Sequence, residues 1–215
     1  MSTSASLSLV QRHRLSESAV RLQREFSGHF GTETIERFLH DSLDRLVPDA
    51  NYHDFVALLA ERFARERLRS LAKMEGHVTT DHPTILFLCV HNAGRSQMAS
   101  GFAMHHGGDA VDVLSGGSEP ASEVNPVAIE AMREVGIDIT SQFPTPWTDE
   151  TLGAADVIVT MGCGDACPVV PGKRYLDWAL TDPAGKGIED VRPIRDEIEQ
   201  RVLGLLAELD VPVNA

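Results

Sequence analysis

From Thr84 onward, short apolar runs alternate with stretches whose apolar residues recur at helical spacing. The clearest run is ILFLCV at Ile85–Val90, and a helical pattern follows it over residues 96–105. A continuous apolar run of this length is typical of a strand that is buried on both faces. Strands that alternate with helices indicate a parallel sheet covered by helices. This part of the chain is therefore expected to be an α/β domain.

Three further expected strands complete a sheet of four parallel strands flanked by helices. They lie at 111–115, 156–161 and 174–178, and two more helices are expected at 126–135 and 188–209. Ligands bind beyond the carboxyl ends of such strands, near a change in strand order. Polar residues that directly follow a strand are thus the first candidates for a functional site.

Residues 8–75 have a different pattern, with three stretches of helical periodicity. Three short amphipathic helices bury only a small core. We therefore expect residues 1–80 to form a three-helix bundle that docks on the second part of the chain or pairs two subunits into a homodimer. The linker is expected within 76–83, which leaves 81–215 as the α/β domain.

Charge is unevenly distributed between these two parts. Residues 1–80 carry 11 basic and 11 acidic side chains, whereas the rest carries 8 basic and 21 acidic ones and accounts for the net charge of −13. A protein that binds nucleic acid usually has a basic surface, so no nucleic-acid partner is expected. A helix-turn-helix DNA binder is the alternative for the helical part, but its neutral charge favours packing or dimerisation.

The chain contains three cysteines, and its longest apolar run is far below the ~20 residues of a membrane span. Its first residues are polar and then basic, the reverse of a secretory signal. We therefore expect a cytoplasmic protein without a membrane partner. In that reducing compartment, an odd number of cysteines is more typical of redox or catalytic chemistry than of static disulfides.

The segment FLCVHNAGRS places Cys89 at the end of an expected strand, with five residues between it and Arg95. If this loop wraps into a helix that begins near Ser96, its backbone N–H groups converge beside the sulfur, and the helix dipole adds positive potential. That field favours the thiolate, which is the nucleophilic form, and the guanidinium can hold two oxygens of a tetrahedral anion. The serine hydroxyl can donate to the sulfur. A buried core cysteine is the alternative.

The loop itself is the expected anion-binding cradle. Asn92 and Gly94 tolerate the positive φ that such a loop needs, whereas His91 is either part of the site or simply solvated. The nucleotide-binding pattern Gly-x-x-x-x-Gly-Lys-Ser/Thr is absent. The substrate-binding candidates are Val90, His91, Asn92, Ala93, Gly94 and Arg95.

A thiolate that attacks an oxyanion needs an acid to protonate the leaving oxygen. In LDWALTDP, Asp182 precedes a proline, which favours an extended conformation, and it follows the last expected strand at the same sheet edge as the cysteine loop. Asp177 is the competing candidate. An Asp that only forms a turn before proline is the alternative to a catalytic role.

CVHNAGRS with a downstream Asp-Pro resembles the low-molecular-weight tyrosine phosphatase family. The segments SGGSEPASEVNPVAIEAMREVGIDIT, ADVIVTMGCGDACP and DWALTDPAG are more similar to the arsenate reductases of that superfamily. The resemblance covers 84–209 and leaves out residues 1–80. It implies that Cys89 is the nucleophile, Arg95 the oxyanion clamp, Ser96 the thiolate stabiliser and Asp182 the general acid. The acidic potassium-site residue of the family corresponds to Ser100, so no metal is expected.

TMGCGDACP holds the other two cysteines, Cys163 and Cys167. The resemblance to three-cysteine reductases implies a relay in which Cys89 attacks arsenate, Cys163 attacks the Cys89 sulfur and releases arsenite, and Cys167 moves the disulfide outward to thioredoxin. Three residues separate the two relay cysteines, fewer than in the best-known reductases of this type. A disulfide between them is possible but tight.

Several alternatives to this relay stay open. One is a mycothiol- and mycoredoxin-dependent arsenate reductase that uses Cys89 only. A second is a tyrosine phosphatase, although few aromatic residues follow the Asp-Pro pair. A third is a non-enzymatic sensor of arsenic or phosphate. If Cys163 and Cys167 take no part in a relay, the alternative is that they are buried thiols or half of a metal site. No bound cofactor is expected in any case, only an external reductant.

Overall fold

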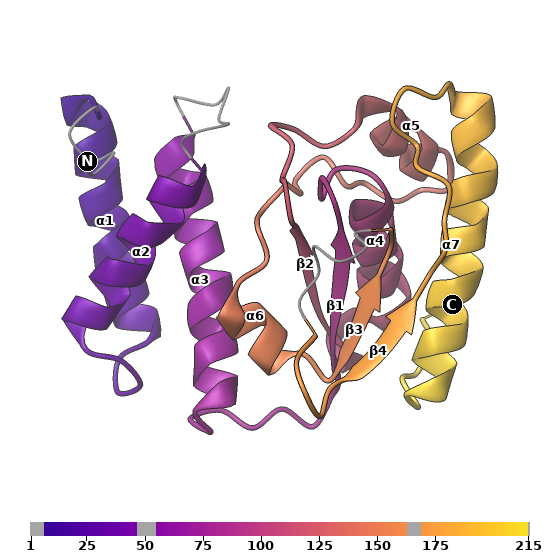
Figure 1. The fold of residues 1–215 in the computed structure, drawn as a ribbon. Helices are drawn as coiled ribbons and strands as arrows, with labels where there is room; N and C mark the ends of the chain where they lie inside the picture. Colours follow the sequence, from indigo (N-terminus) through magenta and orange to yellow (C-terminus); the bar gives the residue numbers. More distant parts are fainter. Residues whose placement is uncertain (1–6, 47–54, 163–168, 215) are drawn as a thin grey trace. The chain divides into compact units, whose positions relative to one another are not determined.

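The computed structural model describes residues 7–46, 55–162 and 169–214, and it divides the chain into two compact units, Met1–Thr79 and Thr80–Ala215 (Figure 1). Each unit has its own hydrophobic core. No helix within the described residues combines the length and the apolar composition needed to cross a bilayer.

The first unit contains the three helices predicted from the sequence: α1 (Leu9–Glu25), α2 (Thr32–Leu46) and α3 (Val56–Met74). A capping box starts α1, because the Ser8 hydroxyl accepts from the Gln11 N–H while the Gln11 side chain accepts from the Ser8 N–H. The helices pack through one shared apolar core, which includes Leu15, Leu22, Ile35, Leu39, Leu43, Ala60, Ala64 and Leu68.

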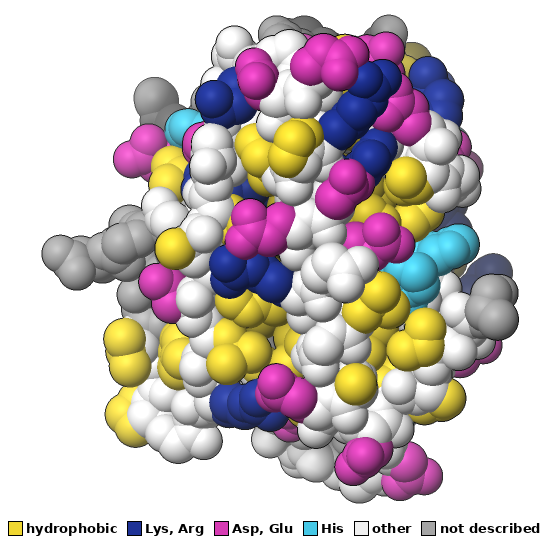
Figure 2. All heavy atoms as spheres, turned by 90° about the vertical axis from the view of Figure 1, so that its right-hand side faces the viewer, with side chains coloured by type: hydrophobic (Ala, Val, Ile, Leu, Met, Phe, Trp, Pro, Cys, Tyr) yellow, Lys and Arg dark blue, Asp and Glu magenta, His cyan; other side chains and the backbone are white. Residues whose placement is uncertain are grey.

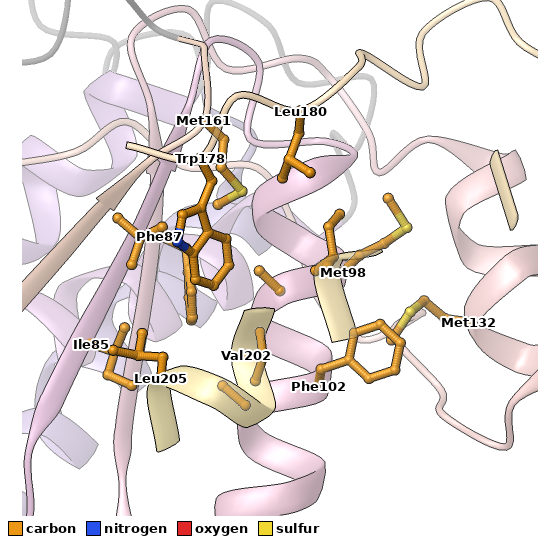
Figure 3. Close-up of a cluster of buried hydrophobic side chains, with 14 of the residues drawn as sticks. Ile85, Phe87, Met98, Phe102, Met132, Met161, Trp178, Leu180, Val202 and Leu205 are labelled. Atoms are coloured by element: carbon orange, nitrogen blue, oxygen red, sulfur yellow. The ribbon is translucent and has the colours of Figure 1, made fainter. Parts of the chain in front are cut away.

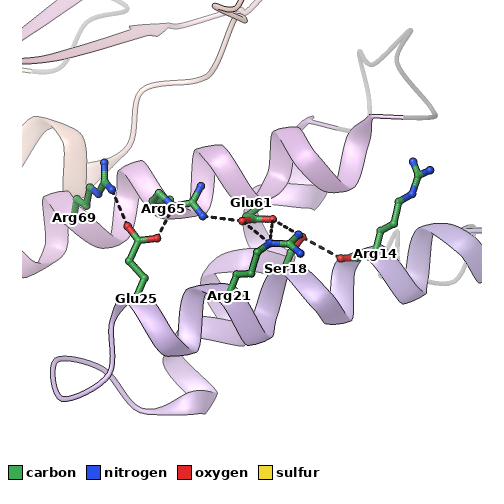
Figure 4. Close-up of polar contacts among 7 residues, drawn as sticks. All are labelled: Arg14, Ser18, Arg21, Glu25, Glu61, Arg65 and Arg69. Atoms are coloured by element: carbon green, nitrogen blue, oxygen red, sulfur yellow. Dashed lines mark hydrogen bonds and ion pairs between the residues drawn. The ribbon is translucent and has the colours of Figure 1, made fainter.

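Ion pairs link α1 to α3 on one side of this bundle (Figure 4). The Glu61 carboxylate, only 3% exposed, accepts from Arg21 at 2.6 Å and from Arg65 at 2.7 Å. Arg65 also contacts Glu25, which in turn contacts Arg69. Burial by itself raises the pKa of Glu61, but the hydrogen bonds from its partners outweigh that effect and hold the pKa at about 2.

Replacing Glu61 with glutamine should lower the free energy of unfolding at pH 7 by about 2 kcal/mol, because Arg21 and Arg65 lose their shared carboxylate. In the wild type, the contribution of Glu61 to the free energy of unfolding is complete above a pH of about 4.5. It is lost as the pH falls toward 2, because the pKa of Glu61 is lower in the folded protein than in the unfolded chain. Urea unfolding of the whole chain, followed by far-UV circular dichroism, measures both effects. Glu17→Gln, which removes an exposed contact with His13, should change stability by less than about 0.5 kcal/mol. Equal losses in both variants would contradict the prediction.

The second unit is an α/β domain whose four parallel strands have the order β2-β1-β3-β4. This confirms the predicted fold class. The strands are β1 (Thr84–Cys89), β2 (Asp112–Gly117), β3 (Val157–Thr160) and β4 (Arg174–Asp177). The helices are α4 (Arg95–Gly107), α5 (Pro126–Glu134), α6 (Asp149–Ala154) and α7 (Ile188–Glu208), with a short 3-10 turn, η3 (Gly108–Ala110).

Strand β1 lies in the middle of the sheet and is buried along its whole length. Its side chains alternate between two apolar clusters. Ile85, Phe87 and Cys89 face the larger cluster, which is built with residues of α4, α5 and α7 (Figure 3), whereas Leu86 and Leu88 face the α6 side. The strand therefore delivers Cys89 to the face that carries α4.

Helix α6 has no counterpart among the predicted elements. It spans only six residues, too few to show a helical period in the sequence. Thr148 caps it through its side chain, which accepts from the Thr151 N–H.

Helix α7 faces the viewer in Figure 2, where acidic and basic side chains are interspersed. Several of these charges are paired: Arg192 contacts Glu134 of α5 at 2.6 Å, and the nearly buried Arg195 contacts Glu134 at 3.1 Å. The arginines also draw the pKa of Glu134 down to about 2. Part of the acidic excess of this domain thus serves to join α5 to α7.

Candidate active site

The predicted nucleophile lies where β1 meets α4. Cys89 ends the strand and is 2% exposed, and Arg95 is the first residue of the helix. The Cys89 sulfur lies 3.0 Å from the Ser96 hydroxyl oxygen and accepts a hydrogen bond from the Asn92 N–H at 3.2 Å. The cysteine therefore sits beside a helix N-terminus with two hydrogen-bonding partners on its sulfur.

The loop between Cys89 and Arg95 has its carbonyl groups turned outward. The carbonyls of Val90, His91 and Ala93 accept from N–H groups in the segment 119–125, each at 2.9 Å. In a trans peptide unit, the N–H points opposite to the C=O. The N–H groups of the same three peptide units therefore point into the loop, as the bond from Asn92 N–H to the sulfur illustrates. This is the backbone arrangement of an anion cradle.

Asn92 contributes more than the backbone conformation expected of it. It does adopt a positive φ of 46°, and its side chain is fully buried. The Asn92 amide nitrogen donates to the Ser96 hydroxyl at 2.9 Å, and its amide oxygen accepts from the Thr145 N–H at 2.8 Å. Since the serine oxygen accepts from Asn92, its own proton is free to point at Cys89. This link could not be predicted from local spacing, because Thr145 lies 53 residues further along the chain.

The Arg95 guanidinium is nearly buried and points toward the loop that follows β4. It donates to the Asp182 carboxylate at 2.5 Å and to the Leu180 carbonyl at 3.3 Å. Gly162, at φ +76°, passes close by: a Cβ there would lie 2.7 Å from the guanidinium. The predicted clamp and the predicted acid are thus brought together, and an incoming anion has to compete with Asp182 for the arginine.

The Asp-Pro pair is fixed against the cradle. Pro183 is buried and packs so closely on Gly94 that a Cβ at the glycine would lie 2.6 Å from the proline ring. Asp182 remains half-exposed, and its second carboxylate oxygen accepts from the Ala184 N–H at 2.9 Å. The competing Asp177 accepts instead from the Thr160 hydroxyl at 2.7 Å. The geometry favours Asp182 as the acid.

Three further predicted site residues are His91, Cys163 and Cys167. The exposed His91 donates through its ring to the Glu119 carbonyl at 3.0 Å, at the rim of the cradle. Cys163 and Cys167 lie outside the described residues, so their positions relative to Cys89 are not part of this geometry. Within the ranges 7–46, 55–162 and 169–214, no three His, Cys, Asp or Glu side chains group as metal ligands would.

Comparison with known proteins agrees with this geometry. Residues 84–214 match the low-molecular-weight phosphotyrosine protein phosphatase family, and residues 15–72 match the N-terminal domain of protein-tyrosine-phosphatase-like proteins. The first match confirms the resemblance predicted for 84–209, and the second assigns the helical unit to a domain family that its sequence pattern had not indicated.

Three similar proteins extend the comparison. A thioredoxin-dependent arsenate reductase from Corynebacterium glutamicum is 42% identical, with a TM-score of 0.81 over 91% of this chain and 96% of that one. Arsenate reductase 2 of Staphylococcus haemolyticus is 43% identical over 57% of this chain and 95% of its own length. A glutaredoxin arsenate reductase from Synechocystis is 39% identical over 58% of this chain and 97% of its own length. The chain belongs to the low-molecular-weight phosphotyrosine protein phosphatase family.

Proposed function

We propose that this protein is an arsenate reductase that serves arsenic detoxification, with Cys89 as its nucleophile. The observation that carries the proposal is the cysteine sulfur bonded by Ser96 and Asn92 at the floor of a backbone cradle, in a chain whose similar proteins are named arsenate reductases. Arsenate is a tetrahedral oxyanion, which is the ligand that such a cradle and an adjacent arginine are suited to hold.

The first step joins the enzyme to the substrate. Arsenate binds in the cradle and replaces Asp182 as the hydrogen-bond partner of Arg95. The Asp182 carboxyl group is then able to carry a proton. The Cys89 thiolate attacks arsenic, and one arsenate hydroxyl group takes the proton from Asp182 and leaves as water. The product is a covalent Cys89–S–As(V) adduct, in which no oxidation state has yet changed.

The next steps transfer two electrons to arsenic. Cys163, as a thiolate, attacks the Cys89 sulfur; the electron pair of the S–As bond stays with arsenic, and As(III) leaves as arsenite. Cys167 then attacks the Cys163 sulfur in the Cys89–Cys163 disulfide, which releases the Cys89 thiolate and leaves a Cys163–Cys167 disulfide. An external dithiol reduces that disulfide and closes the cycle.

Thioredoxin is the proposed reductant, because the similar protein from Corynebacterium glutamicum is thioredoxin-dependent and aligns over nearly the whole chain. A glutaredoxin-type route, with mycothiol and mycoredoxin as one form of it, is the alternative, since a similar Synechocystis protein is a glutaredoxin arsenate reductase. Either route needs a reducing compartment, so the enzyme is proposed to act in the cytoplasm.

A coupled assay tests this proposal. Wild-type protein is mixed with arsenate, thioredoxin, thioredoxin reductase and NADPH, and NADPH oxidation is followed. Arsenate-dependent oxidation that requires thioredoxin supports the proposal. Turnover only with mycothiol and mycoredoxin would favour the alternative reductant. Rapid hydrolysis of p-nitrophenyl phosphate without any arsenate reduction would make the protein a phosphatase, the activity for which its family is named.

We also propose that the N-terminal helices pair two chains into a homodimer. Helix α1 exposes Leu9, Val10 and Val20, and the unit is electrically neutral, which favours association through apolar contacts. Light scattering after size exclusion should give twice the chain mass of 23.4 kDa, and Val20→Lys should shift the protein toward the monomer. Val135→Lys, in the second unit, should leave the mass unchanged. A monomeric wild type would rule out the pairing.

A further inference from the structure

Gln97 lies in the first turn of α4 and is 1% exposed. Its side-chain nitrogen lies 2.8 Å from the Asn92 carbonyl oxygen, 3.1 Å from the Asn92 amide oxygen and 3.3 Å from the Phe143 carbonyl oxygen. Two of these three neighbours are backbone carbonyls, which can only accept. The group that faces them must therefore be the amide nitrogen of Gln97 and not its oxygen.

The Asn92 amide is oriented by the same reasoning. Its oxygen receives the Thr145 backbone N–H, which can only donate, as well as the Gln97 nitrogen. Its nitrogen is therefore directed at the Ser96 oxygen, and the Ser96 hydroxyl is left to donate to Cys89. A rotated Asn92 amide would set nitrogen against these two donors. Gln97 therefore helps to stabilise the Asn92 orientation that leaves the Ser96 hydroxyl proton directed at the Cys89 sulfur.

Gln97 also supports the backbone of Asn92. A non-glycine residue at positive φ is strained and needs surrounding contacts to stay there. Gln97 bonds the Asn92 carbonyl and ties it to Phe143, in a segment that is itself held on β2: the Thr145 carbonyl accepts from the Gly117 N–H at 2.9 Å. The cradle is in this way anchored to the neighbouring strand.

We propose that Gln97 is a positioning residue for the Cys89 thiolate, acting through Asn92 and Ser96. The proposal rests on the part of the proposed function that makes Cys89 the nucleophile. It does not depend on arsenate, and it applies equally if the anion is a phosphate ester. Nothing in the sequence pattern had singled out Gln97.

The test measures how readily the thiolate forms. In a Cys163→Ser, Cys167→Ser background, Cys89 is the sole thiol, and its rate of alkylation by iodoacetamide is recorded against pH. Gln97→Met keeps the length of the side chain but removes the donor. We expect the midpoint of the profile to move up by about one pH unit, so that the rate below the midpoint falls on the order of tenfold, as for a weakened hydrogen bond to an ion. The plateau rate at high pH should not change.

Two controls separate positioning from damage to the fold. Gln200→Met, on the exposed side of α7, should leave the profile unchanged. In a Ser96→Ala background, Gln97→Met should shift the midpoint less than it does with Ser96 present, because only the Asn92 N–H then still links it to the sulfur. Gln97→Glu, whose carboxylate has no donor for the three oxygens, should shift the midpoint at least as far as methionine does.

The proposal is overturned if Gln97→Met leaves the midpoint in place, whether or not the plateau rate changes. It is also overturned if the shift is equally large without the Ser96 hydroxyl. Since no arsenate is used, a negative result in this assay leaves the proposed reductase activity intact. Conversely, a protein that fails to reduce arsenate can still show the predicted shift.

Discussion

Replacing Cys89 with serine should abolish arsenate reduction, with a loss of at least about ten-thousandfold in the coupled assay. A serine hydroxyl stays protonated at neutral pH, and its oxygen cannot enter a disulfide. The cradle around residue 89 is built from backbone groups, so it should survive the change. Isothermal titration with phosphate should therefore still detect anion binding by the variant.

The matched control for this loss is Ser115→Ala. Ser115 lies on the neighbouring strand β2, and its backbone carbonyl accepts from the Thr145 hydroxyl at 3.3 Å. This variant should keep activity within about threefold. Arsenate reduction by Cys89→Ser at even a hundredth of the wild-type rate would mean that another group attacks arsenic.

Replacing Arg95 with lysine should lower kcat/KM for arsenate by about a hundredfold to a thousandfold, although the charge is kept. The planar guanidinium reaches both the Asp182 carboxylate and the Leu180 carbonyl, and it fits the space left by Gly162. An ammonium group cannot span two oxygens of one anion in the same way. Both kcat and KM should change, because the arginine contacts the anion before and during its conversion.

Arg174→Lys is the control for this substitution. Arg174 belongs to the same unit but forms an exposed ion pair with Glu208, so its replacement should change kcat/KM by less than about twofold. If Arg95→Lys also stayed within threefold of wild type, Arg95 would not be the clamp on the anion, and its contact with Asp182 would be structural only.

The β1–loop–α4 segment could be predicted from the sequence because its pattern is local. A run buried on both faces identifies the strand around Phe87, and the spacing from Cys89 to Arg95 then sets the loop. The choice of Asp182 over Asp177 could be argued from position alone. Its physical basis is a tertiary contact, the packing of Pro183 on Gly94, which no spacing rule contains.

Other parts of the site could not be predicted, for a common reason. The link from Gln97 through Asn92 to Thr145 joins segments that are brought together only when α4 and the segment 143–145 beside β2 pack on the sheet. A buried glutamine in the first turn of a helix looks, in sequence, like any polar residue of a solvent-facing turn. The identity of the oxyanion could not be predicted from the cradle either, because every tetrahedral anion presents similar oxygens to it.

The most direct test of the proposed chemistry is a single turnover without reductant. Fully reduced protein is mixed with arsenate, quenched by acid, and mapped for disulfides by peptide mass spectrometry while arsenite is counted. We expect one arsenite for each chain, with a Cys163–Cys167 disulfide in the wild type and a Cys89–Cys163 disulfide in the Cys167→Ser variant. Release of arsenite with all three cysteines still reduced, or a disulfide pattern in Cys167→Ser that excludes Cys89, would contradict the proposed cysteine relay.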